Sequence, residues 1–120
     1  MKSKNQVVTD KYCLYLGDCC QVLPQLPDES VAFSVFSPPF CSLYAYSDDP
    51  VDMGNSRTYE EFFEHFCFLV KELQRLLLPG RIVAVHCMDL PTHKNSGEEI
   101  GLRDFPGDII RCFQKESFIY

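Results

Sequence analysis

The sequence predicts an α/β domain built on an open, mostly parallel sheet with helices on its faces. Two apolar runs, VAFSVF at residues 31–36 and IVAVHC at residues 82–87, are typical of strands that are covered on both faces. A helical pattern of apolar residues lies between the two runs. A strand, a helix and a second strand in this order predict parallel pairing through a right-handed crossover.

The chain has the length of one small domain, taken as residues 1–120. Its 120 residues are 46% hydrophobic and 23% charged, which is ordinary for a globular protein and argues against a disordered chain. The sequence contains neither a stretch of ~18 apolar residues nor a signal-peptide core after MKSKNQ. We therefore expect a soluble, cytoplasmic protein with no membrane partner.

Charge and cysteine content narrow the possible functions. A net charge of −6 argues against strong nucleic-acid binding by this chain alone, because phosphate neutralisation needs clustered Lys and Arg. The seven cysteines are odd in number and include no Cys-x-x-Cys pair. This pattern favours reduced thiols over a disulfide framework or a metal site, so we expect no metal.

The elements before the first apolar run are short. Residues 12–16 (YCLYL) predict a strand that ends at Gly17 and Asp18. The following CCQVLPQL predicts a brief helix, interrupted near Pro24 because proline lacks the donor that a helix interior needs. Residues 27–30 (PDES) predict a polar turn into the run at 31–36.

The clearest helical pattern begins at Thr58. Thr58 and Glu61 fit a capping box, and apolar residues then recur every three or four positions through Leu77. Pro79 and Gly80 end the pattern. The aromatic inner face of this helix is interpreted as core rather than as a cofactor site. Residues 41–57 before it lack a period and predict a long loop.

Weaker signals follow the run at 82–87. Residues 88–103 predict a second loop, and residues 108–114 (DIIRCFQ) predict a helix. Residues 118–120 (FIY) are interpreted as the beginning of a further strand.

Three strand ends are expected to meet at one edge of the sheet: Gly17 with Asp18, residues 37–40, and residues 86–89. Ligands of open α/β sheets bind beyond the carboxyl ends of the strands, so this edge is the predicted binding crevice. The sequence SPPF at 37–40 lies there, and its two prolines stop the strand and fix the backbone.

The tetrapeptide could hold a planar aromatic amine. The amine would stack on Phe40, which is worth ~1–3 kcal/mol for a nucleobase. Its exocyclic NH2 would donate to the Ser37 hydroxyl and to the Pro38 carbonyl, and these two acceptors would orient the nitrogen lone pair toward an electrophile. From these four residues alone, a purely structural rigid turn remains the alternative.

The stretch LGDCCQVLPQLPDESVAFSVFSPPF resembles the N-terminal part of amino-group DNA methyltransferases, in the permuted beta group, whose catalytic motif precedes the cofactor glycine motif. YEEFFEHFCFLVKELQRLLLPGRIVAVH is similar to the next helix and strand of that family. The resemblance implies a partial Rossmann-like methyltransferase fold. It also implies methyl transfer from S-adenosylmethionine to the exocyclic amine of a flipped-out adenine or cytosine in DNA; which base is left open.

The resemblance assigns roles to individual positions. Asp18 matches an acidic residue near the adenine ring of S-adenosylmethionine. Tyr44 and Tyr46 lie, by position only, where they could wall the base pocket. The four catalytic positions are Ser37, Pro38, Pro39 and Phe40.

The chain also departs from the family pattern. The glycine-rich turn that cradles the cofactor is absent, and the six glycines form no substitute. We therefore expect the N-terminal, catalytic-motif half of a larger enzyme, without its cofactor glycine motif and target-recognition region. Alone it should be inactive and could pair with a second copy of itself. Alternatives are a catalytically inactive truncated methyltransferase, or an amide methyltransferase acting on protein, although that group has Asn in place of Ser37.

Two further residues carry open interpretations. A carbon-5 cytosine methyltransferase needs a nucleophilic cysteine directly after proline, whereas Cys41 follows Phe40, so Cys41 is interpreted as core or pocket lining. His86 is interpreted either as a hydrogen-bonded core histidine or as a polar group at a strand end.

Overall fold

The chain alternates short strands with helices. The computed structural model describes residues 3–41 and 47–120, with the backbone alone at Ser96. Short 3-10 turns lie at Leu23–Gln25, Met53–Asn55 and Lys94–Ser96. The strands and α-helices are β1 (Asn5–Val8), β2 (Cys13–Leu16), α1 (Cys19–Val22), β3 (Val31–Phe36), α2 (Tyr59–Leu76), β4 (Leu77–Val85), β5 (Leu90–Thr92), β6 (Gly101–Arg103) and α3 (Phe105–Lys115).

The predicted strand–helix–strand unit is present. β3 and β4 pair in parallel, with Phe33 opposite Ile82 and Phe36 opposite Val85, and α2 makes the crossover between them. The register shifts near the start of the pair, where Pro79 and Gly80 interrupt β4. Gly80 has a φ of +73°, a left-handed conformation that residues with a Cβ rarely adopt. Helix α2 thus ends at Leu76, slightly before the predicted stop.

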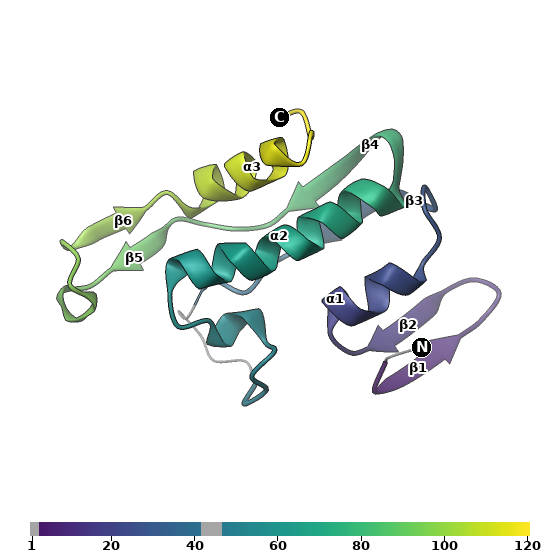
Figure 1. Cartoon of the computed structure of the whole chain (residues 1–120), viewed down its shortest axis with the longest axis horizontal. Helices are drawn as coiled ribbons and strands as arrows, with labels where there is room; N and C mark the ends of the chain where they lie inside the picture. The colour runs from purple at the N-terminus through teal and green to yellow at the C-terminus, as the bar shows by residue number, and fades with distance from the viewer. Residues whose placement is uncertain (1–2, 42–46) are drawn as a thin grey trace.

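The expected mostly parallel sheet is not what the described residues form. β1 with β2 and β5 with β6 are antiparallel pairs, and Figure 1 shows them at opposite ends of the molecule. The sequence predicted β2 but missed its partner β1, and it predicted a loop where β5 and β6 lie. Residues of β1 are all exposed, so no alternation of apolar and polar side chains marks that strand. Residues 118–120 were expected to begin a strand, but they form neither a strand nor a helix.

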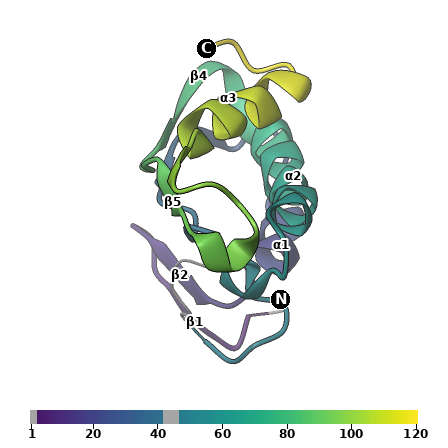
Figure 2. The same ribbon diagram turned by 90° about the vertical axis from the view of Figure 1, so that its left-hand side faces the viewer.

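Only one face of the β3–β4 pair is covered. Phe36, Val83 and Val85 pack against the core, and Figure 2 shows α2 on the side of the molecule opposite β4. On the other face Phe33 is 56% exposed, and Val35 and Ile82 are each 67% exposed. The prediction that both faces are covered is therefore wrong for the described chain. A continuous apolar run indicates that both faces of a strand are covered, but it does not indicate whether this chain or another polypeptide covers the second face.

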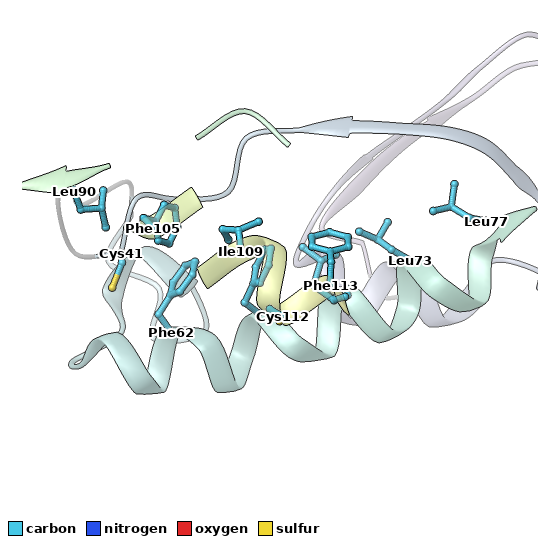
Figure 3. Packing of buried hydrophobic residues seen from close by; sticks show 12 residues of the cluster. Cys41, Phe62, Leu73, Leu77, Leu90, Phe105, Ile109, Cys112 and Phe113 are labelled. Atoms are coloured by element: carbon cyan, nitrogen blue, oxygen red, sulfur yellow. The ribbon is translucent and has the colours of Figure 1, made fainter. Parts of the chain in front are cut away.

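The core lies between α2 and α3. Thr58 caps α2 by accepting a hydrogen bond from the Glu61 amide at 3.0 Å, as the capping box predicted. The predicted inner face is buried, and Figure 3 shows Phe62 of α2 directed toward Phe105 at the start of α3. Helix α3 is longer than predicted because Asp104 caps it through the Gly107 amide at 2.9 Å.

The overall shape is extended for the length of the chain. The radius of gyration is 15.6 Å and the principal extents are 51 × 34 × 20 Å. A compact domain of this length has a radius of gyration of about 13.6 Å. Among the described residues, no helix has both the length and the apolar character that crossing a membrane requires.

Arg75 joins α2 to the segment that precedes β3. Its guanidinium donates to the carbonyls of Leu26 at 2.9 Å and Leu23 at 3.0 Å, and to Glu72 at 2.7 Å, and it also pairs with Asp28. The Arg75 side chain is 27% exposed, so these bonds are partly shielded from water.

We expect Arg75→Ala to lower the urea midpoint of unfolding, because it leaves the Leu23 and Leu26 carbonyls and Glu72 without their donor. Urea denaturation followed by circular dichroism measures this change. Lys71→Ala is the matched control, since Lys71 is exposed on the same helix. Equal urea midpoints for the two variants would mean that the Arg75 bonds contribute nothing net.

Candidate active site

Ser37 lies directly beyond the end of β3, beside the end of β4. The His86 amide donates to the Phe36 carbonyl at 2.9 Å, which extends the strand pairing by one residue. The Ser37 hydroxyl donates to the His86 carbonyl at 3.1 Å, and its oxygen lies 3.3 Å from His86 Nδ1. The prediction that the ends of β3 and β4 lie side by side is therefore confirmed. His86 is exposed at the strand end, so its interpretation as a core residue was wrong.

The remaining residues of the tetrapeptide turn inward. Pro38 is buried, and Pro39 and Phe40 are half-buried. The Phe40 ring lies 6.4 Å from the ring of Phe105, edge to face, and 6.4 Å from the ring of His86. Cys41 follows with a φ of +32° and is 7% exposed within the core, one of its two predicted locations. Phe40 thus has core contacts as well as a place beside Ser37.

Asp18 caps the short helix α1. Its Oδ1 accepts from the Cys20 amide at 2.9 Å, and Asp18 follows β2 directly, as the sequence predicted. A carboxylate can accept further bonds at its other oxygen, so the cap does not exhaust Asp18 as an acceptor.

A cavity of about 670 Å³ joins Asp18 to the tetrapeptide. Ser37, Pro38 and Pro39 line it together with Asp18, whereas Phe40 does not. The inner face of α2 and the end of β2 contribute apolar walls. The apolar lining residues are Leu16, Leu23, Phe36, Val51, Met53, Phe66, Leu69 and Leu73. The predicted crevice shared by Asp18 and Ser37 is thus present as a cavity that has apolar walls and several polar and charged residues.

The loop before α2 supplies cavity residues that sequence reasoning did not single out. Asp49 pairs with Lys4 at 3.1 Å, and Asp52 accepts from the Gly54 amide at 2.8 Å and from Ser47 at 2.7 Å. The Val51 amide, followed by Lys4, lowers the pKa of the Asp49 carboxyl below its usual value. The only signal for these cavity residues in the sequence was the aperiodic loop at 41–57, which indicated a region but not individual residues.

Two of the predicted site residues, Tyr44 and Tyr46, lie outside the residues that the structure describes.

A possible metal site was also considered. Among the described residues, Asp18, Cys19 and Cys20 place three potential metal-ligand atoms within 4.8 Å of one another. Asp18 already caps α1 and the two thiols share a hydrogen bond, which lowers the pKa of Cys19. Three such atoms fall short of the four protein ligands of a structural zinc site.

Comparison with known sequences finds a methyltransferase. The chain is 32% identical over 66 residues to the type II methyltransferase M.SfiI of Streptomyces fimbriatus. The match covers 55% of this chain but only 15% of that protein. No family model matches the chain.

Comparison with solved structures extends the likeness over more of the chain. A crystal structure of a protein described as a DNA modification methylase from Thermus thermophilus superposes with a TM-score of 0.66 at 25% identity. The match covers 86% of this chain and 37% of that protein. A further structure of the same protein, in complex with S-adenosyl-L-methionine, matches with a TM-score of 0.66 at 24% identity and 40% coverage. This chain therefore spans well under half the length of the proteins it matches.

Proposed function

We propose, from the premise that this chain is homologous to DNA methyltransferases, that it holds the target amine during methylation of DNA. The observation that carries the proposal is the position of Ser37, beyond β3 and at the wall of a cavity that also reaches Asp18. The substrate in this proposal is the exocyclic amino group of adenine or cytosine in a flipped-out nucleotide. Both bases present such an amine, so the choice between them stays open.

Ser37 would act as a hydrogen-bond acceptor. Its hydroxyl donates a hydrogen bond to the His86 carbonyl, which leaves the lone pairs of Oγ to accept from an amine N–H. Pro38 supplies a carbonyl acceptor held by a backbone that two prolines restrict. Two acceptors on one NH2 draw its lone pair out of conjugation and aim it away from the acceptors. Pro39 fixes the geometry, and Phe40 offers its ring as a stacking partner at the edge of the core.

S-adenosylmethionine would supply the electrophilic methyl group. The cavity fits one part of such a cofactor, because its apolar walls can take an aromatic ring while Asp18 offers a carboxylate acceptor. The chain does not fit the methionine part, since none of its six glycines provides a Gly-x-Gly turn. Such a turn lets backbone amides approach the ligand where a Cβ would block them.

We propose further that residues 1–120 form the catalytic-motif half of a larger methyltransferase domain. The exposed face of β3–β4 and the large radius of gyration support this, because both are typical of a domain with part of its cover missing. The net charge of −6 supports it too, since the grip on DNA phosphates would come from another part of the enzyme. The exposed face could also pair two copies of the chain in isolation.

Two measurements test the function. Calorimetric titration of the isolated chain with S-adenosylmethionine should give little or no heat, because only one wall of the cofactor site is present. The chain combined with a polypeptide that carries a cofactor glycine motif, here called the reconstituted enzyme, should transfer tritiated methyl groups to DNA. Digestion of that DNA to nucleosides identifies the methylated base.

The opposite results are equally informative. Micromolar binding of the cofactor by a monomer of this chain would mean that these residues contain a complete cofactor site. Label in protein rather than in DNA would favour an amide methyltransferase. A reconstituted enzyme that binds cofactor but transfers no methyl group would leave the chain a catalytically inactive relative.

A further inference from the structure

Two cysteine side chains meet between α2 and α3. The Sγ atoms of Cys67 on α2 and Cys112 on α3 lie 3.2 Å apart, although the residues are 45 positions apart in the sequence. Figure 3 places Cys112 where α3 faces α2. A disulfide bond is about 2.05 Å long, so the two sulfur atoms need to approach by only about 1.1 Å to bond.

The two thiols have different surroundings. Cys112 is 4% exposed, and burial together with the neighbouring Cys67 thiol raises its pKa to about 12. Cys67 is only half-buried. An oxidant from solution therefore reaches Cys67 first, and Cys112 is the thiol placed to react with whatever forms there.

The other sulfur pair in contact is less suited to a disulfide. Cys19 and Cys20 share a hydrogen bond but are adjacent in the chain. Adjacent Cα atoms are about 3.8 Å apart, below the roughly 4.4–6.8 Å that ordinary disulfides span. Among the described residues, Cys67 and Cys112 are thus the better placed pair.

We propose that Cys67 and Cys112 form a reversible disulfide that fastens α3 to α2 in the presence of a small disulfide oxidant such as oxidised glutathione. The Cys67 thiolate attacks one sulfur of the oxidant, giving a mixed disulfide and one equivalent of glutathione. The Cys112 thiol, losing its proton to solvent, then attacks the Cys67 sulfur and releases the second equivalent. The chain loses two hydrogen atoms, and one oxidised glutathione becomes two reduced molecules.

The bond would reach the candidate site through α3. Phe105 begins α3, and its ring packs edge-on against Phe40 and lies 5.5 Å from the ring of Phe62. Fastening α3 to α2 therefore fixes the surface behind Phe40. The inference is independent of the proposed methyl transfer, because the thiol chemistry needs neither DNA nor cofactor.

Peptide mapping of the full chain tests the proposal. The protein is equilibrated in glutathione buffers of set oxidised-to-reduced ratio, free thiols are alkylated under acid-quenched denaturing conditions, and trypsin is added without reductant. Trypsin yields peptides 58–71 and 112–115, each with one cysteine. We expect these two peptides to appear linked, at a mass two hydrogen atoms below their sum. The oxidised protein should melt roughly 10 °C higher than the reduced protein, because the cross-link restricts the unfolded chain.

Variants separate the two steps. Cys112→Ser should accumulate glutathione on Cys67, whereas Cys67→Ala should leave Cys112 as a free thiol and abolish the shift in melting temperature. Cys19→Ser is the matched control and should leave the 58–71 to 112–115 link unchanged. If Cys112→Ser fails to fold, the peptide map of the wild-type protein and the Cys67→Ala variant still test the proposal. Both peptides fully alkylated, at oxidant levels that modify the exposed Cys13, would overturn the proposal.

Discussion

Phe62→Ala is expected to lower the free energy of unfolding by about 3–5 kcal/mol. The Phe62 side chain is fully buried, stacked on Phe66 at 5.6 Å and within 5.5 Å of the Phe105 ring. Its removal leaves a cavity where α2 meets α3. Small domains have total stabilities of roughly 5–15 kcal/mol, so this loss would remove a large share of the total stability. Urea denaturation monitored by near-ultraviolet circular dichroism measures it.

Phe68→Ala provides a matched control for this prediction. Phe68 is the same residue type on the same helix but is 60% exposed. Its removal should change stability by about 0.5 kcal/mol or less, as for ordinary surface substitutions. If Phe62→Ala is too unstable to purify, Phe62→Leu keeps part of the contact and should show an intermediate loss. Equal losses for Phe62→Ala and Phe68→Ala would contradict the described packing of α2.

Ser37→Ala is expected to lower methyl transfer by the reconstituted enzyme without lowering stability. Loss of one preorganised hydrogen-bond partner costs about 2–4 kcal/mol in the transition state, which corresponds to a rate reduced by roughly 30- to 1,000-fold. Stability should change little because the Ser37 side chain is exposed. Single-turnover rates with tritiated cofactor, together with melting curves, measure both effects.

Ser30→Ala is the control for the catalytic effect. Ser30 lies in the turn before β3, where its hydroxyl donates to the Pro27 carbonyl at 2.6 Å, and it does not line the cavity. An unchanged rate for Ser37→Ala would reduce the tetrapeptide to a structural turn. Phe40→Ala would test the stacking role of Phe40 less cleanly than Ser37→Ala tests the acceptor role of Ser37. The core contact of Phe40 with Phe105 means that its removal should also lower stability.

Local signals in the sequence predicted the central part of the fold. Thr58 and Glu61 form a cap within four residues, and the spacing after them identifies the buried face of α2. The double proline after β3 likewise acts on its own backbone. These features depend on neighbours in the sequence, so they can be read without knowledge of the tertiary structure.

Features set by distant partners were not predictable in the same way. β1 forms a strand only because β2 pairs with it, and its exposed side chains carry no burial pattern. Pro91 within β5 argues against a strand on propensity alone, yet the residue pairs with Leu102 in a short edge hairpin. The coverage of the β3–β4 pair depends on polypeptide that lies outside the run itself.

The candidate site likewise contains features that could be predicted from the sequence and features that depend on distant partners. The sequence correctly placed Asp18 and Ser37 beside one cavity, although among the described residues β2 and β3 belong to different sheets and share no edge. The partnership of Ser37 with His86 joins residues 49 positions apart and depends on the register of β4 against β3. Asp49 and Asp52 lie in an aperiodic loop, where composition does not single out individual residues.

The hairpin of β1 and β2 gives the cavity a wall of low local stability. None of its strand residues is buried, although Leu16 and nearby Lys4 line the cavity. Segments with so few buried contacts open at a small cost in free energy, independently of global unfolding. A ligand that needs this wall binds only those molecules in which the hairpin is closed, and its apparent dissociation constant rises in inverse proportion to that fraction. Any contact that holds the hairpin closed would therefore strengthen binding without touching the ligand.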